Sequence, residues 1–305
     1  MFKESSLEKH IATEKKEDRI EEKAEKEKVP WDTKIILQRH GEFYNQKPGD
    51  PEFEKLEKEK KIGLLTDRGI KRTQEATKEK LSEILKNEKP SDIVFLYSPT
   101  EWLDWRSEQG WEKGYGSRGK HTTKVILDTI GSELERKTKL GEAIKDKIRI
   151  TGIGPKDKLR ELDIFYIYDA PNPRAYIEAL REKFGKEDWW EEYYNIVKDI
   201  EPLREETGAE SPVDLSNRVE NLIKIISLYK GKLRKETPNR SLVIWMITHK
   251  ELIRSYLQHG LKAEETDIKD YEPKHNESID INITPNSEII SKFKDKKYKV
   301  DLDHK

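Results

Sequence analysis

Short apolar runs alternate with longer segments of helical periodicity along most of the chain after residue 30. Each run is about five to seven residues long and is bounded by polar or turn-forming residues, which is typical of strands. The run at 242–247 is apolar at every position, as a parallel strand buried on both faces is. The predicted strands are 34–38, 92–97, 148–153, 242–247, 278–284 and 298–302.

Predicted helices separate these strands. Thr66 is placed to cap a helix that opens at Asp67, and Ser211 followed by Pro212 marks the start of another, because proline suits the first helical position. The predicted helices are 66–87, 119–130, two within 172–201 that Gly185 separates, 212–230 and 249–260. Strands that alternate with helices predict an α/β fold, a three-layer sandwich in which a mostly parallel sheet carries helices on both faces.

Two segments depart from this rhythm. Residues 1–29 hold 17 charged side chains, eight basic and nine acidic. Such a segment buries too little apolar surface to offset the entropy lost on ordering, so 1–30 is predicted to be a solvated tail or a helix with i,i+4 ion pairs. The folded domain then covers 31–305. Its Trp-rich insertion near 101–117 is either a lid that selects substrate or a surface loop packed by its own tryptophans.

The composition of the 305-residue chain is unusually charged. Charged residues make up 40%, against about 25% in an ordinary globular protein, and hydrophobic residues only 33%. Sixty Lys and Arg against sixty-one Asp and Glu leave a net charge of −1. No overall field therefore recruits nucleic acid or an anionic membrane, and we expect neither as a partner.

Other features of the sequence exclude further classes of protein. No apolar run approaches the ~20 residues that span a bilayer. The first residues, MFKESSLEKH, include acids and lack the apolar stretch of a secretory signal, so we expect a cytoplasmic location. With no Cys, the chain has no disulfide, no thiolate metal site and no cysteine nucleophile.

Two predicted strands run directly into a histidine. The strand at 34–38 is followed by Arg39-His40-Gly41-Glu42, and the strand at 242–247 by Thr248-His249. Ligands of open α/β sheets bind beyond the carboxyl ends of the strands, so the two histidines are predicted to meet in one site. His249 also opens a helix, whose N-terminal N–H groups and dipole favour an anion.

Six motifs in this order resemble the histidine phosphatase superfamily, which includes the cofactor-dependent phosphoglycerate mutases. Arg-His-Gly alone is a weak match of three residues, whereas the ordered set is specific and spans about 34–303. The resemblance implies a phosphoglycerate mutase-like sandwich and a histidine phosphatase domain. The motifs are Arg39-His40-Gly41, Leu65-Thr66-Asp67-Arg68-Gly69, Ser98-Pro99, Leu159-Arg160-Glu161, Glu210-Ser211-x-x-Asp214 with Arg218-Val219, and Thr248-His249 with Ile253-Arg254.

The resemblance implies a role for each of four residues. His40 would be the nucleophile that attacks phosphorus to form a phosphohistidine, for which it must be neutral. Arg39 would bind phosphate oxygens through its planar donor fork, and His249 would donate hydrogen bonds to charge that develops on the transferred group. Glu161 would be the general acid that protonates the leaving oxygen and later activates water.

A second arginine completes the phosphate pocket in the family, usually three residues after the Ser-Pro serine, and that spacing fails here. Arg118 is the preferred replacement, because Arg118 followed by Thr122 reproduces the family's Arg-x-x-x-Thr at the start of the next helix. Arg106 is the rival candidate. Glu42 and Asn45 are predicted to contact substrate.

The remaining histidines lack such a pattern. His121 is expected to be structural, and His10, His259 and His275 are expected to be exposed. Residues 249–253 read His-Lys-Glu-Leu-Ile, not the His-Glu-x-x-His of a zinc site. We therefore expect a metal-independent reaction with no cofactor.

Three functions are compatible with these residues. The leading prediction is a phosphomonoester hydrolase that acts on a phosphorylated small molecule or a phosphoprotein. A phosphoglycerate mutase-type phosphotransferase is the first alternative, but mutases of the family follow the acid with Arg-His-Tyr-Gly, whereas Glu161 is followed by Leu-Asp-Ile-Phe. The second alternative is an inactive binding module on the same fold, against which the retention of Arg39 and both histidines argues.

Overall fold

The computed structural model describes residues 31–46, 49–97, 117–142, 144, 146–154, 173–185, 201–207, 209–236, 239–263 and 272–300. The predicted tail at 1–30 and, apart from Ser117, the predicted Trp-rich insertion near 101–117 lie outside these residues.

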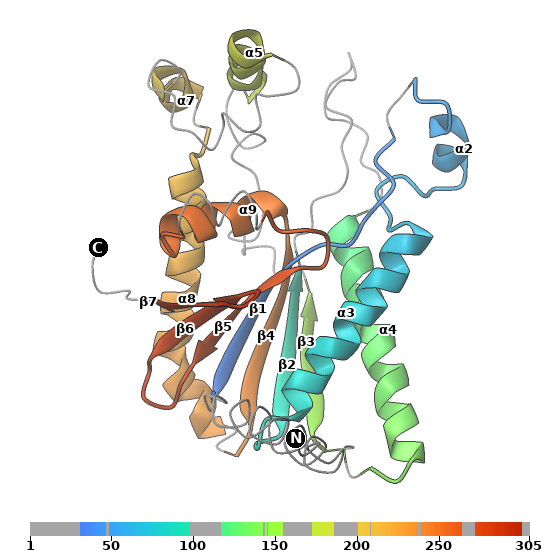
Figure 1. Cartoon of the computed structure of the whole chain (residues 1–305), viewed down its shortest axis with the longest axis vertical. Coiled ribbons are helices and arrows are strands. Elements are labelled where there is room, and N and C mark those ends of the chain that lie inside the picture. Colours follow the sequence, from blue (N-terminus) through green and yellow to red (C-terminus); the bar gives the residue numbers. More distant parts are fainter. Residues whose placement is uncertain are drawn as a thin grey trace, which may run out of the picture.

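A seven-stranded sheet forms the centre of the molecule, in the order β3-β2-β4-β1-β5-β6-β7 (Figure 1). Neighbouring strands in the part β3-β2-β4-β1 run parallel, and β5, β6 and β7 extend the sheet antiparallel beyond β1. The strands are β1 Thr33–Arg39, β2 Ser91–Tyr97, β3 Ile148–Gly154, β4 Ser241–Thr248, β5 Ser278–Ile283, β6 Ile289–Phe293 and β7 Lys296–Val300. The parallel part is formed by the four strands predicted first along the chain.

Helices cover both faces of this sheet. On one face lie α3 and α4, and on the other lie α8 and α9 (Figure 1). Consecutive residues of β1 alternate between the two cores: Ile35 and Leu37 pack toward α8, and Ile36 packs toward α3. The predicted three-layer α/β sandwich with helices on both faces is therefore confirmed.

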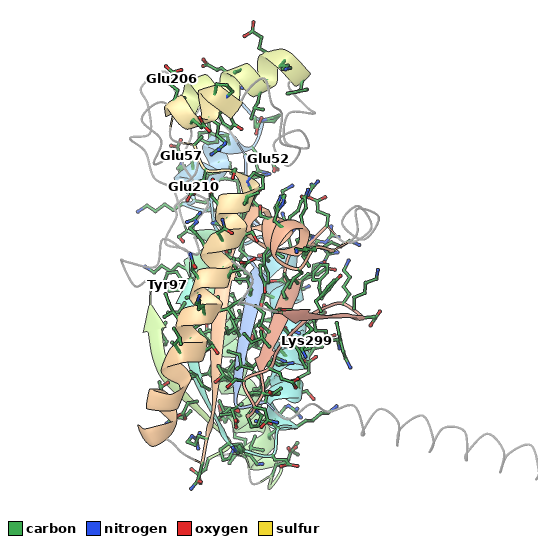
Figure 2. The ribbon with its side chains drawn as sticks, turned by 90° about the vertical axis from the view of Figure 1, so that its left-hand side faces the viewer. Glu52, Glu57, Tyr97, Glu206, Glu210 and Lys299 are labelled. Atoms are coloured by element: carbon green, nitrogen blue, oxygen red, sulfur yellow. The ribbon has the colours of Figure 1, made fainter. Side chains whose placement is uncertain are left out.

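The helices follow the predicted order, with some differences in length, except that the short helices at 53–58 and 201–207 were not predicted. They are α2 Phe53–Lys58, α3 Asp67–Leu85, α4 Arg118–Lys139, α5 Pro173–Phe184, α7 Glu201–Thr207, α8 Pro212–Glu236 and α9 Lys250–Ser255, which continues into a π-helical turn, η2 Tyr256–Gly260. Figure 2 shows α8 lying lengthwise along the sheet, with Glu210 at its beginning. Among the described helices, none is both long and apolar enough to span a membrane.

Helix ends agree with the capping residues read from the sequence. The Thr66 hydroxyl accepts a hydrogen bond from the backbone N–H of Gly69 and so caps α3, as predicted. At the start of α8, the Ser211 hydroxyl accepts from the Asp214 N–H, and the Asp214 carboxylate accepts from the Ser211 N–H in return. This reciprocal pair of bonds satisfies donors that the helix itself leaves unpaired.

Helix α4 and strand β6 also differ from the sequence prediction. Helix α4 continues nine residues beyond Ile130, through a charged segment in which Arg136 pairs with Glu133 and Lys139 with Glu135. Its apolar stripe ends earlier, so the pattern understated its length. Strand β6 was missed because it is only five residues long and its apolar residues, Ile289, Ile290 and Phe293, are interrupted by Ser291 and Lys292.

Candidate active site

The two predicted histidines meet because their strands are parallel neighbours. The register of β1 and β4 places Arg39 opposite Thr248, so the two strands end at the same edge of the sheet. The backbone N–H of His40 then donates to the carbonyl of Thr248 at 2.9 Å. The ring centroids of His40 and His249 lie 5.2 Å apart in an edge-on arrangement. The two strand ends therefore bring His40 and His249 together, as the sequence predicted.

The imidazole of His40 is held in one tautomer by its own loop. The side chain is buried, with only 4% of the residue exposed, and Nδ1 lies 2.8 Å from the carbonyl oxygen of Gly41. A carbonyl oxygen can only accept, so Nδ1 carries the proton in this contact. The other ring nitrogen, Nε2, then keeps its lone pair, which is the form that a nucleophile requires.

Arg118 fixes the opposite tautomer on His249. Its Nε and Nη2 lie 3.3 and 2.9 Å from Nδ1 of His249, and an arginine can only donate. Nε2 of the neutral His249 ring therefore carries a proton and is a hydrogen-bond donor. Both side chains are buried, and the guanidinium carbon of Arg118 lies 4.7 Å from the centroid of the Phe43 ring.

Arg39 is held by the loop that precedes β5. Its Nη1 donates to the carbonyl oxygen of Pro273 at 2.8 Å, and its Nη2 lies 3.2 Å from Nε2 of His275. The His275 ring centroid is itself 5.7 Å from that of His40. The site therefore contains three histidines and two arginines, drawn from β1, α4, β4 and the loop before β5.

The surroundings keep all three histidines neutral. Burial lowers the pKa of His40 well below its ordinary value, and the nearby charges of Arg118 and Arg39 lower it further, although the hydrogen bond to Gly41 opposes this. Burial, Arg118 and Arg39 likewise lower the pKa of His249 well below normal. Burial and Arg39 lower the pKa of His275 to about 4. Neutral rings beside two permanent cations are suited to receive an anion.

Contacts from α3 and α4 fix the loop that carries His40. The backbone N–H of Gly41 donates to the Thr122 hydroxyl at 3.0 Å, which ties this loop to the first turn of α4. A side chain at position 41 would meet the Thr73 hydroxyl of α3 at 2.7 Å, so only glycine fits there. His121 accepts a hydrogen bond from the Leu65 N–H at 3.0 Å, a contact of the structural kind expected for it.

The two predicted substrate-contacting residues occupy different surroundings. Glu42 faces the start of α3, where its carboxylate accepts from the Thr66 hydroxyl at 3.2 Å and lies 3.8 and 3.7 Å from Arg68 and Arg72. Asn45 is exposed on the following loop. Neither residue is tied to the histidine pair by a contact of the described structure, and their role toward substrate stays a prediction.

Two other candidates, Glu161 and Arg106, lie outside the described residues. Arg118, the preferred candidate for the second arginine, contacts His249. Arg106, the rival candidate, cannot be compared with it in the described residues. The expectation that His275 and His259 are exposed is wrong, because both are only partly exposed. The wrong prediction for His275 is the more important one, because this residue contacts Arg39 beside His40.

His275 is brought to the site by the pairing of two strands, which the sequence alone does not reveal. The predicted strand near 278–284 pairs antiparallel with β1, and Gln38 lies opposite Ser278. The residues just before that strand therefore fall beside the end of β1, where Arg39 and His40 are. The position of His275 beside Arg39 follows only once the order of the strands is known, and the apolar pattern of the sequence does not give that order.

One groove of the described structure lies away from His40 and His249. It has a volume of about 990 Å³ and runs between α3 and the antiparallel strands β5–β7. His275 lines one part of it, whereas His40 and His249 do not. Its walls carry charges of both signs, so its size alone does not mark it as the reaction site, and the convergence of donors at His40 is the better guide. Within the described residues, no group of three or more His, Asp or Glu side chains is arranged to hold a metal ion.

Fold and site together define an α/β protein in which two arginines and three histidines gather at the carboxyl ends of two parallel strands, an arrangement suited to an oxyanion. No known family model matches the chain, and no curated protein matches its sequence. Among solved structures it is similar to a mycobacterial glucosyl-3-phosphoglycerate phosphatase (14% identity, 85% of this chain and 96% of that one, TM-score 0.40).

Two further solved structures are similar to the same extent. A phosphoglycerate mutase from Bacillus anthracis has 13% identity and a TM-score of 0.44, over 87% of this chain and 92% of its own. A phosphoserine phosphatase from Entamoeba histolytica has 12% identity and a TM-score of 0.39, over 89% of this chain and 98% of its own. Because these TM-scores are below 0.5, the function proposed below rests on the motifs and on the geometry of the site instead.

Proposed function

We propose that this protein is a metal-independent phosphomonoester hydrolase of the histidine phosphatase type, with His40 as the nucleophile. The observation that carries the proposal is the state of His40: a buried, neutral imidazole whose Nδ1 faces the Gly41 carbonyl, so that Nε2 keeps its lone pair. Arg39 and Arg118 lie beside it as cations, and His249 is held as a donor.

The first step transfers the phosphoryl group to His40. The Nε2 lone pair attacks phosphorus, the phosphorus–oxygen bond to the leaving group breaks, and the leaving oxygen takes a proton from Glu161. Arg39 and Arg118 hold the nonbridging oxygens, and the Nε2–H of His249 donates to charge that grows on the transferred group. The product is an alcohol and a phosphohistidine.

The second step returns the enzyme to its starting state. Water attacks the phosphohistidine, and its proton goes to Glu161, now a carboxylate. The nitrogen–phosphorus bond breaks, inorganic phosphate leaves, and His40 regains its lone pair. We favour water over a sugar acid as the acceptor because the Arg-His-Tyr-Gly that follows the acid in family mutases is replaced here. The substrate would be a phosphorylated small molecule or a phosphoprotein.

The experiment is hydrolysis of para-nitrophenyl phosphate in EDTA by wild type, His40→Ala and, as a matched histidine control, His10→Ala. We expect activity in wild type and the control and none in His40→Ala, together with an acid-labile phosphoryl label on His40 in quenched reactions. Transfer between phosphoglycerates without hydrolysis would replace the hydrolase by a mutase. A wild type that never acquires the label with any phosphomonoester tested would favour an inactive binding module.

A further inference from the structure

The loop before β5 supplies a third histidine to the site. His275 is half-buried, its Nε2 lies 3.2 Å from Nη2 of Arg39, and its ring centroid lies 5.7 Å from that of His40. We propose that His275 is a positioning residue: its neutral imidazole accepts a hydrogen bond from Arg39 and holds that guanidinium beside His40 for phosphate binding. The proposal rests on the proposed function for its effect on turnover.

The backbone of this loop is fixed relative to Arg39 by several bonds. The N–H of Arg39 donates to the Glu277 carbonyl at 2.9 Å, and the N–H of Asn276 donates to the Arg39 carbonyl at 3.2 Å. Asn276 adopts a left-handed conformation, with φ of 67°, and its side-chain oxygen accepts from the Thr73 hydroxyl of α3 at 2.9 Å. These bonds fix the backbone of the turn that carries His275, and so they fix the position of its ring relative to Arg39.

The loop before β5 binds both terminal nitrogens of Arg39. Nη1 donates to the Pro273 carbonyl and Nη2 to the His275 ring, so the plane of the guanidinium is set by this loop. A bidentate contact with phosphate depends on that plane, because the donor fork of arginine is rigid. Without His275, Nη2 of Arg39 would lose this bond, and the plane of the fork would be held less firmly.

The contact requires an uncharged His275 ring with the proton on Nδ1, because arginine only donates. The charged and titratable groups that face this ring are Arg39 from β1, Glu42 and His40 from the next loop, Arg72 from α3 and Arg118 from α4. Burial and the cations lower the pKa of His275 to about 4, and Glu42 opposes them. Above that pH the ring is neutral and accepts; below it, the proton on Nε2 breaks the contact.

The first test does not depend on turnover. Long-range proton–nitrogen NMR spectra of the full chain, with His275→Gln used for assignment, report the tautomer of each imidazole. We expect the His275 ring at pH 6.5 to be neutral, with the proton on Nδ1. A proton on Nε2 at that pH, in the tautomer or in the cation, would overturn the proposal whatever the enzyme catalyses.

The second test measures binding of inorganic phosphate by calorimetry, beside KM and kcat for para-nitrophenyl phosphate. His275→Ala should weaken phosphate binding about tenfold and raise KM by a similar factor, because one bond to a charged group is lost. His275→Gln, which keeps an acceptor near the Nε2 position, should recover part of this loss. Lys274→Ala, an exposed neighbour on the same loop, is the control and should bind phosphate as wild type does.

Coupling to Arg39 separates a positioning role from a structural one. In an Arg39→Ala background, His275→Ala should produce no further loss of phosphate affinity, because both variants remove the same oriented donor. An additive loss, or unchanged phosphate binding in His275→Ala, would overturn the proposal while leaving the hydrolase intact. A wild type that binds phosphate but forms no phosphohistidine would instead overturn the proposed function and leave the role of His275 in binding standing.

Discussion

Arg118 and His249, which come from different helices, form one unit in the site. The guanidinium of Arg118, in the first turn of α4, donates to Nδ1 of His249, which stands at the N-cap position of α9. The contact gives Arg118 two roles in the proposed reaction: it supplies positive charge to the phosphate, and it fixes the tautomer in which His249 can donate from Nε2.

Replacing Arg118 should therefore lower kcat/KM by more than the loss of one positive charge would, because the orientation of His249 is lost as well. We expect Arg118→Ala to lower kcat/KM about 10²–10³-fold, the usual cost of one lost transition-state donor. Arg118→Lys should recover only part, because a lysine is a point charge and cannot bond both phosphate and His249 as a fork. Steady-state kinetics with para-nitrophenyl phosphate measures both, and thermal unfolding controls for the loss of packing on Phe43. Wild-type kinetics in Arg118→Lys would contradict the role given to the fork.

The lowered pKa of His40 sets the acid limit of the reaction. A histidine attacks only when neutral, and burial with Arg118 and Arg39 lowers its pKa well below 6.5. The neutral, reactive form of His40 therefore persists as pH falls past 6.5 and is lost only near the lowered pKa. We expect kcat/KM to stay level as pH falls through 6.5, measured with a substrate whose own ionisation is corrected for. A fall in kcat/KM centred at 6.5 would show that His40 titrates as an ordinary histidine.

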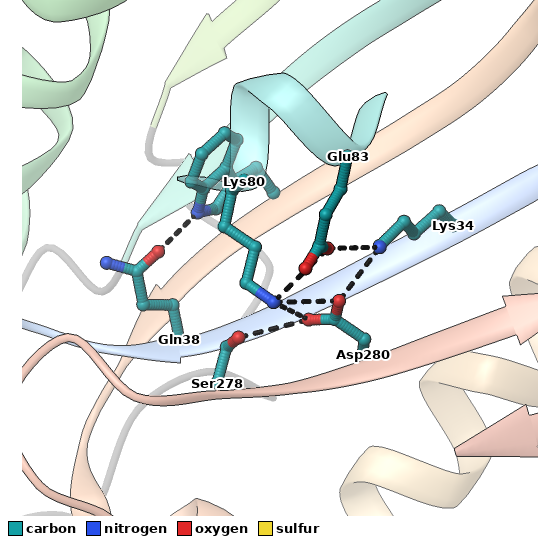
Figure 3. Close-up of polar contacts among 7 residues, drawn as sticks. Lys34, Gln38, Lys80, Glu83, Ser278 and Asp280 are labelled. Atoms are coloured by element: carbon teal, nitrogen blue, oxygen red, sulfur yellow. Dashed lines mark hydrogen bonds and ion pairs between the residues drawn. The ribbon is translucent and has the colours of Figure 1, made fainter. Parts of the chain in front are cut away.

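A buried ion network between α3 and the sheet stabilises the fold and takes no part in the proposed chemistry (Figure 3). Asp280 of β5 lies 2.8 Å from Nζ of Lys34 and 2.9 Å from Nζ of Lys80, and Lys34 also lies 3.2 Å from Glu83. Burial by itself would raise the pKa of Asp280, but the two lysines outweigh it and lower the pKa to about 2. The network therefore links β1, β5 and α3 on the side of the sheet away from α8.

Asp280→Asn should destabilise the protein. It removes the charge that compensates the buried Lys34, and breaking such a pair from one side costs about 3–5 kcal/mol. Because the folded pKa of Asp280 is lowered, its contribution is present above the unfolded value of 3.8 and is lost as pH falls toward about 2. Urea unfolding at pH 7 measures the loss, with Glu135→Gln on the exposed face of α4 as a control that should leave stability unchanged. Equal stability of wild type and Asp280→Asn would contradict this account.

The parallel half of the fold and the centre of the site were predictable from the sequence. Apolar runs with a histidine directly after two of them place His40 and His249 at one sheet edge, because parallel strands share their carboxyl ends. Thr66 and Ser211 were recognisable as caps because their side chains act on the next few residues alone. Such local signals need no knowledge of how strands are ordered.

The parts that escaped prediction depend on polar contacts, some between distant segments and some within one helix. His275 reaches Arg39 because β5 pairs antiparallel with β1, and nothing in the sequence around 275 records that pairing. The apolar pattern also understated α4, whose last turns are held by ion pairs and not by burial. In both cases the deciding interaction is polar, and hydrophobic periodicity does not carry it.

Glu161 is assigned as the general acid by the resemblance of its motif, and the choice of leaving group can test it. An alkoxide leaving group needs protonation as the bond to phosphorus breaks, whereas para-nitrophenolate needs little. We therefore expect Glu161→Gln to lower kcat/KM at least 10²-fold for an alkyl phosphate and less than about tenfold for para-nitrophenyl phosphate. Asp163→Asn, the matched change two residues away, should show no such dependence on the leaving group. Equal slowing of both substrates by Glu161→Gln would remove it from the acid role, and a selective effect of Asp163→Asn would move that role to Asp163.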